Sequence, residues 1–157
     1  MFELHIAWLK TLLHKSDKFA YLKRYSIFKE LSSFELYLLN NYFHARSFKA
    51  GEMLFDKNYP LEVIYFVEKG EISVTGNAHP SGHSTVKKHQ ILGLLDMFHE
   101  NIRSSSAIAL GDLETIAISR HDLTDVIRQN PRMGIKILTG ICHFYSNYIF
   151  TICKPVE

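Results

Sequence analysis

Apolar residues recur at helical spacing in the first part of the chain. One such pattern extends from residue 2 to residue 13, and a second extends from residue 19 to residue 31, so we expect a helix in each. Ser32 or Ser33, with Glu35 just inside, is a typical N-terminal cap for a third helix. The apolar positions of this third helix are Phe34, Leu36, Leu38, Leu39, Tyr42 and Phe43.

After Phe48 the pattern changes to short segments of β-branched and aromatic residues separated by glycines, which is typical of β-strands. The predicted strands are residues 53–55, 63–67, 72–75, 84–88, 105–110 and 115–119. We expect residues 63–67 and 72–74 to pair as an antiparallel hairpin, with Gly70 supplying the positive φ of the turn. The middle of the chain is therefore predicted to form an antiparallel β-roll, a jelly-roll-like barrel.

Two further helices are predicted after the strands. The first covers residues 122–129, and Pro131 then begins a long helix that extends to about Cys153. One apolar stripe of the long helix consists of Leu138, Ile141, Tyr145, Tyr148 and Ile152. Most of the remaining helix surface is apolar as well, so we expect burial on two sides, one of them against a second subunit.

These elements predict an α+β fold in which helices flank an antiparallel β-roll. We divide the chain into an N-terminal helical segment, residues 1–31, and a main domain, residues 32–157, made of helix, β-roll and C-terminal helices. The 157 residues, 46% of them hydrophobic, suffice for one sizeable core.

The charge pattern and the two cysteines limit which partners and which cellular compartment we expect. The net charge is +2, with acidic and basic residues interleaved, so the chain lacks the basic face that binds nucleic acid. Cys142 and Cys153 fit neither a disulfide framework nor a paired metal site. With no signal peptide and no membrane span apparent in the sequence, we expect a cytoplasmic protein without nucleic acid or membrane as partner.

The candidate chemistry lies between Gly93 and Ser105. An arginine, Arg103, comes directly before the small residues Ser104 and Ser105 at the start of a predicted strand, and Gly93 and Leu94 form an apolar turn shortly before it. A guanidinium beside free backbone amides is suited to holding one compact phosphate. This pattern favours a receptor for a small anionic ligand over an enzyme.

Histidines offer an alternative chemistry. His79, His83 and His89 form the densest group, in and after a predicted loop. They could serve a small metal-dependent enzyme, but the chain has no His-x-His pair. We expect these side chains to be solvated, with no catalytic residue, no metal site and no required cofactor.

Three stretches carry a resemblance to a known family. They are Phe28 with Leu31, Ser32 and Leu36; residues 48–55 (FKAGEMLF); and residues 64–74 (IYFVEKGEISV). From about Ile27 to Ile149 the chain resembles the cyclic nucleotide-binding domain family, the β-roll of catabolite-activator-like proteins. The resemblance implies a regulatory domain that is not an enzyme.

The resemblance also assigns a phosphate-binding cassette. Its turn glycine corresponds to Gly93, its arginine to Arg103, and its small residues to Ser104 and Ser105. The family's glutamate, which holds the ribose hydroxyl, corresponds to Leu94, which has no acceptor. The implied ligand is cyclic AMP (cAMP), cyclic GMP (cGMP) or another small anion. Asp96 or Glu100 are the acidic residues that could serve the ribose instead.

The functional expectation is a non-enzymatic sensor module that changes the position of its last helix on binding ligand. Members of the family dimerise through this helix, so the resemblance favours a homodimer. The other possibility is that the helix binds an unknown protein partner. No DNA-binding helix-turn-helix is expected. The alternative is a degenerate scaffold or protein-interaction domain, which binds no nucleotide because Leu94 fills its pocket.

Overall fold

The computed structural model describes residues 18–76, 82–99 and 102–153. Its helices are η1 (Ala20–Arg24), η2 (Ser26–Phe28), α2 (Ser33–Asn40), α3 (Arg120–Gln129) and α4 (Pro131–Ile152). Its strands are β1 (His44–Phe48), β2 (Met53–Phe55), β3 (Val63–Lys69), β4 (Ile72–Gly76), β5 (His83–Val86), β6 (Ile91–Leu92), β7 (Ser105–Ala109) and β8 (Leu113–Ser119). The helix expected over residues 2–13 lies outside the described residues.

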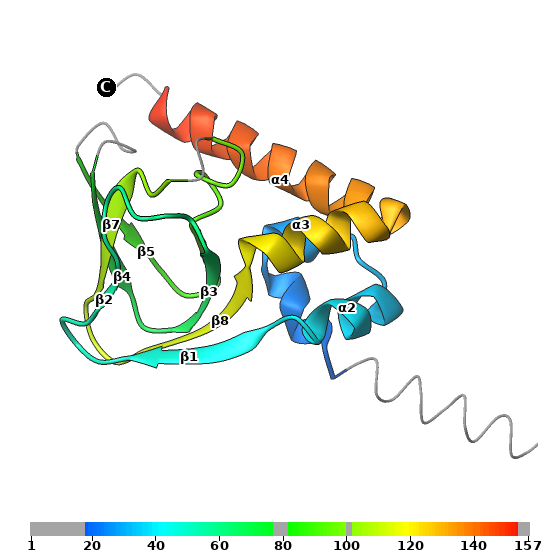
Figure 1. The fold of residues 1–157 in the computed structure, drawn as a ribbon, viewed down its shortest axis with the longest axis horizontal. Helices are drawn as coiled ribbons and strands as arrows, with labels where there is room; N and C mark the ends of the chain where they lie inside the picture. The colour runs from blue at the N-terminus through cyan, green and yellow to red at the C-terminus, as the bar shows by residue number, and fades with distance from the viewer. Residues whose placement is uncertain (1–17, 77–81, 100–101, 154–157) are drawn as a thin grey trace, which may run out of the picture.

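The strands form two antiparallel four-stranded sheets, in the orders β1-β8-β3-β6 and β2-β7-β4-β5. The two sheets form the roll at the left of Figure 1, with α4 passing over its upper side and α2 and α3 lying beside it. The predicted α+β fold with an antiparallel β-roll is confirmed.

The expected hairpin between residues 63–67 and 72–74 is wrong. β3 pairs with β8 and β6, whereas β4 pairs with β5 and β7, so the two strands belong to different sheets. Gly70 does have a positive φ, +86°, but its turn carries the chain from one sheet to the other. Alternating apolar residues identify strands without identifying their partners, and a short connection alone favours the wrong pairing.

Local sequence signals also misplaced two boundaries. The 19–31 pattern forms two short 3-10 helices instead of one helix, because Tyr25 between them is extended, with φ −89° and ψ 126°. α2 begins at its predicted cap, where the Ser32 side chain accepts from the Glu35 N–H and Glu35 accepts from the Ser32 N–H in return. It ends at Asn40, and the polar segment that follows forms β1, an exposed edge strand that pairs with β8.

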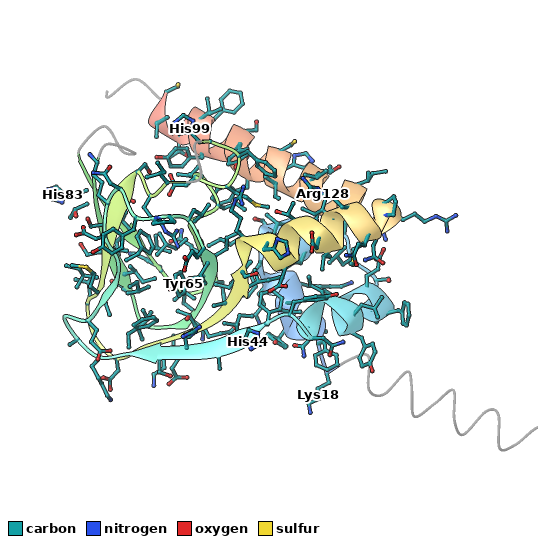
Figure 2. The ribbon with its side chains drawn as sticks, in the orientation of Figure 1. Lys18, His44, Tyr65, His83, His99 and Arg128 are labelled. Carbon is teal, nitrogen blue, oxygen red and sulfur yellow. The ribbon has the colours of Figure 1, made fainter. Side chains whose placement is uncertain are left out.

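Two apolar cores hold the fold together. The first fills the roll and includes Phe55, Tyr65, Val67 and Leu92, and Figure 2 shows Tyr65 inside the roll. The second lies between the sheet and the helices, and it includes Tyr25, Phe28, Phe66, Leu94 and Ile137. Because η1 and η2 supply fully buried residues to the second core, this part of the N-terminal segment packs on the main domain.

α4 is buried in this chain on one side only. Its buried residues are Met133, Gly134, Ile137 and Ile141. A Cβ placed on Gly140 would lie 2.6 Å from the Ile27 Cα atom, so the glycine allows α4 to approach η2 closely. The rest of the helix surface leaves large apolar side chains exposed. Among the described residues, no helix has the length and apolar character needed to cross a membrane.

Candidate functional site

Gly93 forms a bend directly after β6 that another side chain cannot occupy without strain. Its φ is +95°, and a Cβ at this position would lie 2.4 Å from Nη1 of Arg103. The preceding strand is held by pairing of Leu92 with Tyr65 in β3. Gly93 therefore permits both the left-handed backbone and the close approach of a guanidinium to it.

Arg103 is a buried cation that backbone hydrogen bonds fix in place. Its N–H donates to Tyr59 O at 2.8 Å and its C=O accepts from Asn58 N at 2.9 Å. The side chain donates from Nη2 to Val63 O, and its guanidinium carbon lies 3.6 Å from the centre of the Phe55 ring. Only 2% of the residue is exposed, so its charge acts in a region of low dielectric.

Two of the guanidinium nitrogens have no hydrogen-bond partner in the part of the chain that the structure describes. Within the described residues, Nε and Nη1 of Arg103 are buried without a hydrogen bond. Burial lowers the pKa of Arg103 to about 10, and the nearby Tyr65, Asp96 and Glu62 oppose part of that shift. The group is still a cation at neutral pH. Buried N–H donors without acceptors are costly, so this position favours an anion nearby.

A cavity of about 400 Å³ opens beside the Gly93 bend. Gly93, Leu94, Ser104 and Ser105 all line it. Four of the five residues predicted for the site are therefore brought together in one cavity wall. The volume lies within the range of small-molecule sites.

Arg103 contacts the same bend but lines a different hollow. That second hollow has a volume of about 340 Å³, and Arg103 shares its wall with Phe55, Tyr59 and Tyr65. The guanidinium thus lies against the Gly93 backbone without lining the 400 Å³ cavity. In this position Arg103 would attract a ligand in the 400 Å³ cavity only through the intervening bend. Direct contact would require the Arg103 side chain to move.

Leu94 has its side chain in the second core, where it is fully buried together with Ile91 and Met97. Its carbonyl oxygen accepts a hydrogen bond of 2.7 Å from the Tyr145 hydroxyl of α4. Burial raises the pKa of Tyr145 to about 12, with a smaller effect of Asp96, so the hydroxyl keeps its proton at neutral pH. This bond directly joins the bend to the last helix.

Several residues in the cavity wall were not predicted from the sequence. Arg24 and Ser26 come from the N-terminal 3-10 helices, and Phe144 and Tyr148 come from α4. His89, expected to be solvated, also lines the cavity, and its Nε2 atom is buried without a partner among the described residues. The predicted apolar stripe of α4 includes Tyr148, so the sequence did contain a signal that this side chain faces the rest of the protein. No local pattern distinguishes Arg24 from a surface arginine.

Asp96, one of the two acidic residues considered for a ribose hydroxyl, lines the cavity and is 6% exposed. Glu100, the other, lies outside the described residues. Of the residues that the structure describes, no group of three or more histidines, cysteines or acidic residues could hold a metal ion.

Residues 45–130 match the model of the cyclic nucleotide-binding domain family. No curated protein sequence matches the chain.

Solved structures of low sequence identity share the fold. A cyclic nucleotide-binding domain from Methylobacillus flagellatus is 19% identical, with a TM-score of 0.72 over 84% of this chain and 80% of that one. The N-terminal domain of a transcriptional regulator from Streptomyces coelicolor is 19% identical, with a TM-score of 0.67 over 85% and 98%. The sensor domain of the regulator DNR from Pseudomonas aeruginosa is 16% identical, with a TM-score of 0.64 over 87% and 93%.

Substituting alanine at the bend tests the contact between Gly93 and Arg103. Gly51 is a matched control, because its φ is +81° and a Cβ there would meet nothing within 4 Å. Gly51→Ala should lower the free energy of unfolding by about 1–2 kcal/mol through backbone strain alone. Gly93→Ala should cost about 1–3 kcal/mol more, because the guanidinium must also move. Urea denaturation measures both values.

An Arg103→Met background separates the two causes. In this background the difference in unfolding free energy between Gly93→Ala and Gly51→Ala should become smaller. The reason is that Nη1 of Arg103, which the new methyl group would meet, is absent. Equal losses for Gly93→Ala and Gly51→Ala in the native background would contradict the contact.

Proposed function

Because the chain belongs to the cyclic nucleotide-binding domain family, we propose that it is a non-enzymatic regulatory module that binds a cyclic nucleotide or a related small anion. The ligand would occupy the 400 Å³ cavity, and the observation that supports this choice is the Gly93 bend in its wall. The Arg103 guanidinium lies directly behind this bend, and two of its buried nitrogens have no partner in the described part of the chain. No required cofactor is proposed.

The phosphate is proposed to lie against Gly93, Ser104 and Ser105. These residues provide hydroxyl and backbone groups in the cavity wall, while Arg103 supplies positive charge from behind the bend. A charge so deeply buried is poorly screened by salt and solvent. It therefore stabilises an anion even without direct contact, and a small movement of the side chain would add direct hydrogen bonds.

The ribose is held more weakly than in the family pattern. Leu94 provides no acceptor for a ribose hydroxyl, and the loss of one charge-assisted hydrogen bond is worth about 1.5–3 kcal/mol. Asp96 is the acidic residue of the same wall, and we propose that it takes this role in part. The scaffold alternative required Leu94 to fill the pocket. The burial of Leu94 in the core with Met97, beside an open cavity, favours the ligand-binding proposal.

Binding would be transmitted to α4 through two contacts. Phe144 and Tyr148 of α4 line the cavity, and Tyr145 donates to the Leu94 carbonyl in the bend. A ligand that favours one position of the bend would therefore also favour one position of α4. Such a switch requires different affinities for the two arrangements.

Isothermal titration with cAMP and cGMP tests the proposal. Arg103→Met should weaken binding of either nucleotide about tenfold to hundredfold, since the buried charge behind the phosphate is lost. Arg103→Lys, which keeps the charge but loses the planar fork, should give an intermediate affinity. Arg46→Met is the matched control, because Arg46 is exposed on β1 and does not line the cavity.

Folding of each variant is checked by its thermal transition, so that a loss of binding is compared among folded proteins. Heats that are equal in native protein and Arg103→Met, or absent in both, would contradict the proposed function.

We further propose that α4 mediates a homodimer. Its outward surface exposes Ile135 (66%), Ile149 (53%) and Phe150 (70%). No residue from Ile137 to Cys153 is acidic or is a lysine or arginine, so two copies can approach without opposing like charges. Large apolar side chains exposed on one helix are compatible with an interaction surface. Cys142 and Cys153 are free thiols, which is compatible with the reducing, cytoplasmic setting that we propose.

Sedimentation equilibrium tests the homodimer. The native protein should sediment as a dimer, and the double variant Ile149→Glu/Phe150→Glu should be a monomer, because burying two carboxylates in the interface is unfavourable. Phe34→Glu on α2, where the native side chain is 67% exposed, serves as a control that keeps the dimer. A monomeric native protein, or a dimer that survives the double substitution, would contradict the proposal.

A further inference from the structure

The cavity has two chemically distinct ends. Ile91 and Leu92 of β6 line the cavity, and β6 pairs with β3 through Leu92 with Tyr65 and Ile91 with Phe66. At one end Gly93 lies near Val63, whose carbonyl accepts from Arg103. At the other end Arg24 lies near Glu68. Val63 and Glu68 are five positions apart along β3, which corresponds to roughly 16 Å.

The Arg24 guanidinium provides hydrogen-bond donors that a ligand can reach at this second end of the cavity. It lines the cavity from η1, and its side chain is 52% exposed. Its carboxylate neighbour, Glu68, lies at 3.9 Å, which is too far for a hydrogen bond. Glu68 also accepts a hydrogen bond of 2.6 Å from the Tyr25 hydroxyl. Among the described residues, no hydrogen bond engages the Arg24 guanidinium.

We propose that Arg24 recognises the base of the nucleotide and makes the cavity selective for guanine over adenine. This inference rests on the proposed function, which places the phosphate at the Gly93 end and so directs the base toward Arg24. Guanine presents two adjacent acceptors, O6 and N7, that match the planar fork of an arginine. Adenine presents a donor, its N6 amino group, in place of O6, and a guanidinium has no acceptor for it.

His89 is the second polar group at this end. Its N–H donates to Val67 O at 2.8 Å, which fixes the turn before β6, and its ring packs edge-on to Tyr25. The buried Nε2 atom, which has no partner in the described part of the chain, can donate or accept according to tautomer. His89 can therefore serve either base, and the discrimination depends on Arg24.

Calorimetric titration with cGMP and cAMP tests the inference. The native protein should bind cGMP about fivefold to hundredfold more tightly than cAMP, which is the discrimination of one bidentate arginine contact. Arg24→Met should abolish the preference by weakening cGMP alone. Lys23→Met is the matched control, because Lys23 is the exposed neighbour of Arg24 and does not line the cavity. It should retain the preference.

The outcomes separate this inference from the proposed function. Equal affinity of the native protein for the two nucleotides, or a preference for cGMP that survives in Arg24→Met, overturns the role of Arg24 while nucleotide binding stands. Binding of neither nucleotide by the native protein overturns the proposed function and this inference together.

Discussion

The contact of a buried guanidinium with a glycine bend is the interaction on which the rest of the site depends. Arg103 is 2% exposed, lies over Phe55 and leaves two nitrogens unpartnered among the described residues. Each unsatisfied buried donor costs about 1–3 kcal/mol. A desolvated cation–π contact contributes about 2 kcal/mol or more, so the Phe55 ring offsets part of the cost of the two unpartnered nitrogens. The buried guanidinium therefore favours the binding of an anion. A negatively charged ligand beside Gly93 would reduce a cost that the free protein carries.

The two cores explain why this contact can affect the rest of the molecule. Leu92, just before the bend, belongs to the core inside the roll, whereas Leu94, just after it, belongs to the core under the helices. The bend therefore lies where the two cores meet. Its connection to α4 includes a hydrogen bond from Tyr145 together with apolar packing. A shift of the bend cannot leave both cores unchanged, because close-packed interiors do not deform freely.

The sequence predicts the elements better than it predicts their arrangement. The cap at Ser32 and the start of α4 at Pro131 depend on neighbouring residues, and both are confirmed. The pairing of β3 depends on residues about fifty positions away in β8, and the predicted hairpin is accordingly wrong. For the site, a resemblance carried by local motifs named Gly93 and Ser104, which line one cavity. It could not place Arg24, which reaches the cavity from a segment outside the family match.

The most direct measurement of the central contact is the NMR signal of the Arg103 Nε–H group during titration with cGMP. In the free protein we expect a resolved signal that exchanges slowly with water, because the group is buried away from solvent. On addition of the nucleotide the signal should move and saturate together with ligand binding. A signal that exchanges rapidly in the free protein, or that stays unchanged in the nucleotide-saturated protein, would contradict the account.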